Sequence, residues 1–99
     1  MMYELECRYD TRQSFYGKAQ VEEQDLKYLN SGLNKVIKLW SYDTLVAEIH
    51  ERDDRTKYYY FGKYSQTTTR HQKEFFKQNG LSDKEIEKLF KNGIIEKGV

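Results

Sequence analysis

The amino-acid sequence predicts an α+β fold, in which an antiparallel sheet of four to five strands is followed by a C-terminal helical hairpin packed on one face. Apolar and polar side chains alternate through much of the first two thirds of the chain, which is typical of half-buried strands. After residue 66 the apolar spacing changes to three or four residues, which is typical of helices. A chain of 99 residues has room for one hydrophobic core, so we expect a single domain over 1–99 with its sheet at about 3–64.

The strands are expected in the first 64 residues. The first spans 3–10, where apolar and polar residues alternate without a break. The second spans 14–21 and contains Gly17, which indicates a bulge or a close approach of the backbone. Residues 22–34 break the alternation, so we expect a loop with a short helical turn there, or a brief strand at 27–29. The remaining strands are expected at 35–41, 45–50 and 57–64, and the last two flank a charged turn and form an antiparallel hairpin.

Two helices are expected in the last third of the chain, at about 68–79 and 83–92. A threonine run offers N-caps for the first helix, and Thr69 and Gln72 have the spacing of a capping box. Ser82, with a glutamate three residues later, forms a second capping box before the second helix. Each helix is followed by an Asn-Gly pair, which commonly ends helices. The side chains expected to face the sheet are Phe75, Phe76, Ile86, Leu89 and Phe90.

Composition excludes several classes of protein. The single cysteine, Cys7, cannot form an internal disulfide, which excludes a disulfide scaffold and favours a reducing cytosol. No apolar run is long enough for a membrane span and no signal peptide is recognisable, so we expect a cytoplasmic protein with no membrane partner. The 17 basic and 16 acidic residues leave a net charge of +1, which argues against a protein that coats DNA.

The sequence offers little for catalysis or metal binding. Cys7 lies on the apolar face of an expected strand, where a buried thiol is far commoner than a nucleophile. Neither His50 nor His71 has a cysteine or carboxylate at ligand spacing. For His71, beside the helix caps, an orienting hydrogen bond is favoured over a role as general base. We therefore predict no catalytic residue, no metal and no cofactor, and keep a nuclease-like enzyme using Arg70 and His71 as a third hypothesis.

The distribution of charge indicates one candidate surface. Residues 55–80 contain six basic residues and one acidic residue, a net charge of +5, and include the aromatic run at 58–64. One face of that strand must meet the core, and the other displays rings beside lysines, as in surfaces that bind single-stranded nucleic acid or proteins. The third interpretation is that tyrosine simply favours strands. The predicted partner-binding residues are Lys57, Tyr59, Lys63, Tyr64, Arg70, His71, Lys73 and Lys77.

Two stretches resemble sequence boxes of a known family. They are residues 39–49, with the sequence LWSYDTLVAEI, and residues 64–75, with the sequence YSQTTTRHQKEF. The family consists of small uncharacterised phage and plasmid proteins of Gram-positive bacteria. Some anti-CRISPR proteins, which are small inhibitors of RNA-guided nucleases, come from the same pool of mobile genes.

The resemblance implies a non-enzymatic mobile-element protein in the host cytoplasm that binds and inhibits a host nuclease or nucleoprotein complex. The alternative is a small nucleic-acid-binding or regulatory protein. Nucleic acid can take part in binding under either hypothesis.

Overall fold

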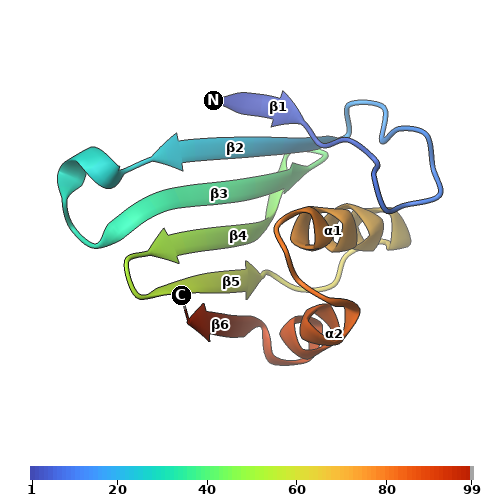
Figure 1. Cartoon of the computed structure of the whole chain (residues 1–99). Coiled ribbons are helices and arrows are strands. Elements are labelled where there is room, and N and C mark those ends of the chain that lie inside the picture. The colour runs from blue at the N-terminus through green and yellow to red at the C-terminus, as the bar shows by residue number, and fades with distance from the viewer. Residues whose placement is uncertain (99) are drawn as a thin grey trace.

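Six antiparallel strands form one open sheet in which spatial order follows chain order, and two helices cover one face of it (Figure 1). The computed structural model describes residues 1–98. These features confirm the α+β class and the two helices near the C-terminus, which follow the first five strands; a sixth strand, one more than expected, comes after them. The strands are β1 (Met2–Glu4), β2 (Ala19–Asp25), β3 (Leu33–Ser41), β4 (Thr44–Arg52), β5 (Arg55–Tyr60) and β6 (Ile94–Gly98), and the helices are α1 (Gln66–Gln78), α2 (Asp83–Asn92) and a short 3-10 helix, η1 (Lys27–Leu29).

The helix α2 forms where its local signals place it. The Ser82 hydroxyl accepts from the backbone N–H of Glu85 at 3.2 Å, and the Glu85 carboxylate accepts from the backbone N–H of Ser82 at 2.8 Å. This completes the predicted capping box and satisfies two backbone donors that the helix itself leaves unpaired. Gly93 ends the helix with a φ of 83°, a left-handed conformation that glycine adopts without steric cost.

The helix α1 begins earlier than the threonine run indicates. Its N-cap is Ser65, whose hydroxyl accepts from the backbone N–H of Thr68 at 3.1 Å. The predicted capping box of Thr69 and Gln72 is wrong. The Thr69 hydroxyl instead donates to the carbonyl of Ser65, and the Gln72 amide donates into the sheet.

The N-terminal strands differ from the prediction. β1 ends at Glu4, and residues 5–18 form a long loop instead of the second half of one strand and the start of another. Gly17, with a φ of 74°, lies in a turn closed by a hydrogen bond from Lys18 N–H to the Phe15 carbonyl, not at a bulge within a strand. β2 therefore starts at Ala19 and runs into the segment expected as a loop, of which η1 keeps the predicted helical turn.

The strand that the sequence did not indicate is β6. After Gly93 the chain turns back along β5, with a hydrogen bond from Tyr60 N–H to the Gly93 carbonyl at 2.9 Å. Ile95 then lies opposite Tyr58 in an antiparallel pair. β5 correspondingly ends at Tyr60, before the predicted end at residue 64, because the chain must leave the sheet to reach α1.

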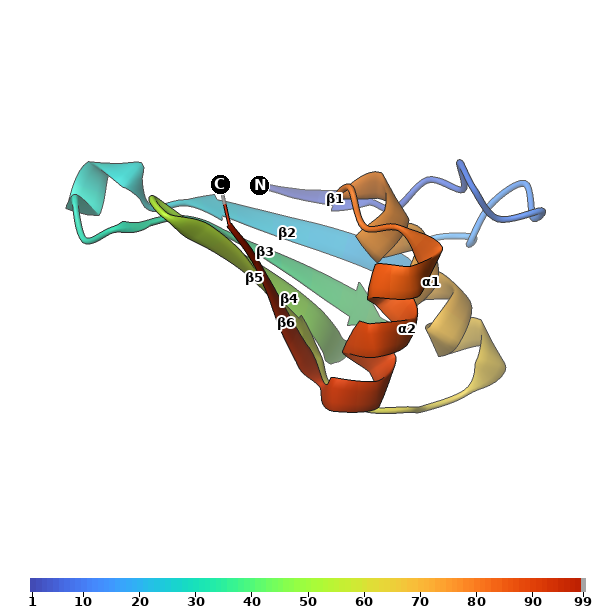
Figure 2. The ribbon, with the colours of Figure 1, turned by 60° about the horizontal axis from the view of Figure 1, so that its bottom comes forward.

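The hydrophobic core lies between the sheet and the two helices. Phe75 and Phe76 of α1 are fully buried, as is Leu89 of α2. Because side chains alternate across a strand, the residues between the core positions of β2 and β3 point to the opposite, uncovered side, which we call the outer face. Figure 2 shows both helices on one side of the sheet, with the β2–β3 connection extending away from them.

Candidate functional site

The two sequence boxes meet in a buried polar cluster. Ser41, at the end of β3, contacts His71 of α1, with 2.8 Å between its Oγ and Nδ1. The same Oγ lies 3.0 Å from the hydroxyl of Thr68. His71 is fully buried, with its ring edge-on to Phe15 at 4.5 Å between centroids, and burial lowers its pKa to about 4. His71 is thus enclosed in the core and not displayed for a partner as predicted, because α1 turns it toward the sheet.

Two further residues of α1 tie distant segments to the helix. Glu74 is 2% exposed, and its Oε1 accepts from the backbone N–H groups of Tyr9 at 2.9 Å and Asp10 at 2.8 Å. The Gln72 amide donates to the carbonyls of Val46 in β4 at 3.0 Å and of Gly62 at 3.3 Å. These contacts give the buried polar residues of the box 64–75 a structural role, since each satisfies a group that folding removes from water.

The outward stripe of α1 is basic. Arg70 and Lys73 are exposed and Lys77 is half-buried, and their spacings of three and four residues place them on one side of the helix. Lys63 and Tyr64, in the loop before α1, are exposed beside the start of this stripe. We call these five residues the α1 ridge.

The ridge retains unpaired positive charge. Arg70 pairs with Asp10 at 3.4 Å and Lys77 pairs with Asp83 at 3.0 Å, in both cases between partly exposed groups. Lys63 and Lys73 form no ion pair within residues 1–98. Open grooves flank the ridge, one lined also by Tyr9 and two carboxylates, the other by two apolar and two acidic side chains of α2. The arrangement can therefore offer cations together with a small apolar margin to a partner.

Two predicted partner-binding residues lie elsewhere, on the outer face of the sheet. The Lys57 ammonium is 3.2 Å from the Glu96 carboxylate, and the hydrogen bond from Lys57 holds the pKa of Glu96 below its usual value. The Tyr59 ring packs on His50 at 4.7 Å and is stacked with Phe61 at 6.4 Å between centroids. The basic stretch of the sequence is thus divided between two opposite sides of the molecule, because β5 and α1 present their side chains in different directions.

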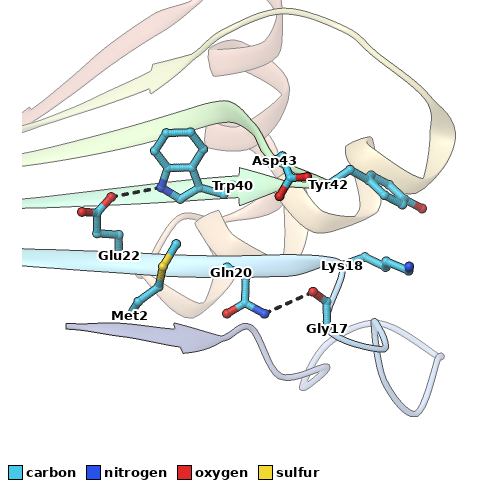
Figure 3. A pocket seen from close by; sticks show the side chains of 8 residues that line it. All are labelled: Met2, Gly17, Lys18, Gln20, Glu22, Trp40, Tyr42 and Asp43. Atoms are coloured by element: carbon cyan, nitrogen blue, oxygen red, sulfur yellow. Dashed lines mark hydrogen bonds between the residues drawn. The ribbon is translucent and has the colours of Figure 1, made fainter.

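Sequence reasoning missed a groove on the outer face, at the end of the sheet where β1, β2 and β3 lie side by side (Figure 3). The indole of Trp40 donates from Nε1 to Glu22 Oε1 at 3.1 Å, and the Gln20 amide donates to the Gly17 carbonyl at 3.1 Å. We call this site the Trp40 groove. It is lined by Met2, Gly17, Lys18, Gln20, Glu22, Trp40, Tyr42 and Asp43.

The end of the Trp40 groove is formed by the β3–β4 turn, which carries backbone strain. Tyr42 and Asp43 have φ values of 57° and 108°, in a region that residues other than glycine rarely adopt. The Lys18 ammonium lies 5.9 Å from the centroid of the Tyr42 ring. The groove exists because the register of β2 against β3 places Gln20 opposite Trp40. The sequence alone does not reveal this register.

Comparison with known proteins identifies the family. The model of DUF8033, a family of unknown function, matches residues 3–92. The chain belongs to the DUF8033 family. No curated protein and no solved structure matches this DUF8033 chain.

Two further kinds of site are absent from the part of the chain that the structure describes. Within residues 1–98 no three or more His, Cys, Asp or Glu side chains come together in a way that could hold a metal ion. Neither α1 nor α2 has the length and apolar character that crossing a membrane requires. The candidate binding surfaces are the α1 ridge and the Trp40 groove.

Proposed function

We propose that this DUF8033 protein acts by binding, and that the α1 ridge docks on a phosphate-bearing surface of a nucleoprotein complex. The observation that carries the proposal is that the two sides of α1 differ in their contacts. Its buried polar residues hold the fold together, whereas its outward stripe, after Gln66, carries three cations at helical spacing. Lysine and arginine on an exposed helix are well suited to contact phosphate oxygens.

The number of cations supports a nucleoprotein partner over naked nucleic acid. The ridge has four basic residues, and Arg70 and Lys77 already have acidic neighbours. Four phosphate contacts on a duplex give a slope of about −3.6 in a plot of log affinity against log salt, so binding through them alone weakens steeply at physiological salt. The exposed Tyr64 ring and the groove beside α2, where Ile86 and Phe90 lie among charged side chains, add contacts that a protein component can use.

The narrowest form of the proposal is an inhibitor of a host RNA-guided nuclease in the host cytoplasm. It is supported by the resemblance of residues 39–49 and 64–75 to small phage and plasmid proteins. An inhibitor of this kind requires a stable scaffold and a complementary surface, and no active site of its own. The alternative remains a small nucleic-acid-binding or regulatory protein that uses the same ridge without a protein partner.

Affinity capture from a lysate of a Gram-positive host, with and without nuclease treatment, tests the proposal. The ridge variant carries Lys63→Glu and Lys73→Glu, both at residues without an ion pair within residues 1–98. The control variant carries Lys27→Glu and Lys88→Glu, which change the net charge equally at exposed positions away from the ridge.

The proposal predicts a nucleoprotein complex that the wild type and the control retain and the ridge variant loses. Equal retention by all three proteins would remove the ridge from the binding surface. Nanomolar binding of naked RNA or DNA at physiological salt would favour the alternative. For the narrow form, the captured nuclease must lose cleavage activity when the wild-type protein is added.

A further inference from the structure

The Trp40 groove, on the opposite side of the sheet from the helices, combines an aromatic wall with carboxylates that have no cationic partner. Glu22 and Asp43 both line the groove. Neither forms an ion pair within residues 1–98, whereas other carboxylates of the sheet, such as Glu23 and Glu96, do. Among the residues that line the groove, two carboxylates stand against one cation, Lys18. Lys38 lies opposite Glu22 in the β2–β3 pair, but it forms no ion pair within residues 1–98.

The Trp40 indole orients one of these carboxylates. Its N–H donates to Oε1 of Glu22 at 3.1 Å, which holds the carboxylate beside the ring. Oε2 of Glu22 makes no hydrogen bond within residues 1–98 and can accept from a ligand. An indole face next to a fixed carboxylate suits a guanidinium group, which stacks on an aromatic ring while its edge donates hydrogen bonds.

The groove's own lysine does not neutralise this charge. The Lys18 ammonium lies over the Tyr42 ring, 5.9 Å from its centroid, and Figure 3 shows its side chain pointing away from Glu22. The Met2 side chain forms the wall on the β1 side (Figure 3), and its flexible thioether can adjust to the methylenes of an entering side chain. The space between Trp40 and Met2 thus has apolar walls, and the Glu22 carboxylate at its end can accept hydrogen bonds.

We propose that the Trp40 groove binds an arginine side chain presented by a protein partner. The guanidinium stacks on Trp40 and donates to Glu22, and Asp43 adds negative charge from the β3–β4 turn. Charge complementarity selects this occupant over an acidic peptide or a phosphate, which Glu22 and Asp43 would repel. The inference does not rest on the α1 ridge, so each surface can fail without the other.

The chain supplies its own probe, because Trp40 is its one tryptophan. The emission of Trp40 is followed while the full-length protein is titrated with the peptide acetyl-Gly-Arg-Gly-amide at low salt. The matched probe replaces arginine with citrulline, which has nearly the same shape and no charge. We expect a saturable change in emission with the arginine peptide, with a millimolar dissociation constant, and a much weaker response to the citrulline peptide.

Variants then locate the effect in the groove. Glu22→Gln keeps an oxygen that can accept from the Trp40 N–H but removes the charge, and should raise the dissociation constant about tenfold. Glu87→Gln, an exposed residue of α2, removes the same charge on the other side of the molecule and should leave it unchanged. Circular dichroism checks that each variant is folded.

Three results would each overturn the proposal: no saturable change with the arginine peptide, equal affinity for the citrulline peptide, or unchanged affinity in Glu22→Gln. If Glu22→Gln fails to fold, Asp43→Asn takes its place, since asparagine tolerates the left-handed backbone of that turn. Its affinity must then fall relative to the wild type, and an unchanged value would contradict the proposal.

Discussion

Protonation of His71 should destabilise the protein in mild acid, and the size of the effect can be worked out. The ring is 0% exposed, and burial lowers its pKa from 6.5 to about 4. The unfolded chain then binds a proton near pH 6.5, whereas the folded chain does not until the pH approaches 4. The contribution of the neutral ring to the free energy of unfolding is therefore complete above pH 6.5, and it is lost as the pH falls from 6.5 toward 4.

With these two pKa values, the linkage relation gives a loss of about 2 kcal/mol in the free energy of unfolding between pH 7 and pH 5. Other groups also titrate in this range, so the comparison needs a variant without the imidazole. In His71→Asn the side chain can still meet the Ser41 hydroxyl, and this protein should be less stable at pH 7 but lose less stability on acidification.

Urea unfolding of both proteins at pH 7, 6 and 5 measures the effect as the difference between their free energies of unfolding. That difference should shrink by about 2 kcal/mol from pH 7 to pH 5. A difference that stays constant with pH would refute the reasoning, because it would mean that His71 is as easily protonated in the folded protein as in the unfolded chain.

The fold makes three more predictions that equilibrium unfolding or proteolysis can check. Ser82→Ala should lower the free energy of unfolding by about 1 kcal/mol, because the N-cap of α2 is lost, and an unchanged urea midpoint would contradict it. Phe75→Ala should cost about 3–5 kcal/mol, because its ring is fully buried between α1 and the sheet, and near-parental stability would remove it from the core. Glu74→Ala should cost about 2–4 kcal/mol and speed proteolysis within residues 5–18, since two backbone donors lose a charged acceptor, and an equally resistant loop would show that other contacts hold it.

The parts of the fold that the sequence predicts correctly depend on short-range signals. The start of α2 is determined by Ser82 and Glu85, three residues apart, and its end by Gly93. The prediction of a first strand over 3–10 is wrong because the conformation of its second half depends on a distant residue. Glu74 accepts hydrogen bonds from the backbone of Tyr9 and Asp10, 65 and 64 residues away, which holds the alternating segment in a loop.

For the candidate sites too, the sequence predicts what depends on neighbouring residues and not what depends on distant ones. The sequence indicates the cations of the α1 ridge because helical spacing is visible along the chain. The predicted binding surface also included Lys57 and Tyr59, because they are close to these cations in sequence. The structure places these two residues on the outer face of the sheet. The Trp40 groove depends on the register of β2 against β3 and was not visible in any local pattern.

Site-specific photo-crosslinking in the host cell tests the central claim, that the protein binds its partner through the α1 ridge. A photoreactive amino acid is placed at Gln66, an exposed residue at the start of the ridge stripe, or at Ser31, an exposed residue of the β2–β3 connection away from the helices. We predict that a component of a nucleoprotein complex is crosslinked from position 66 and not from position 31. Crosslinking of that component from position 31 alone would contradict the account.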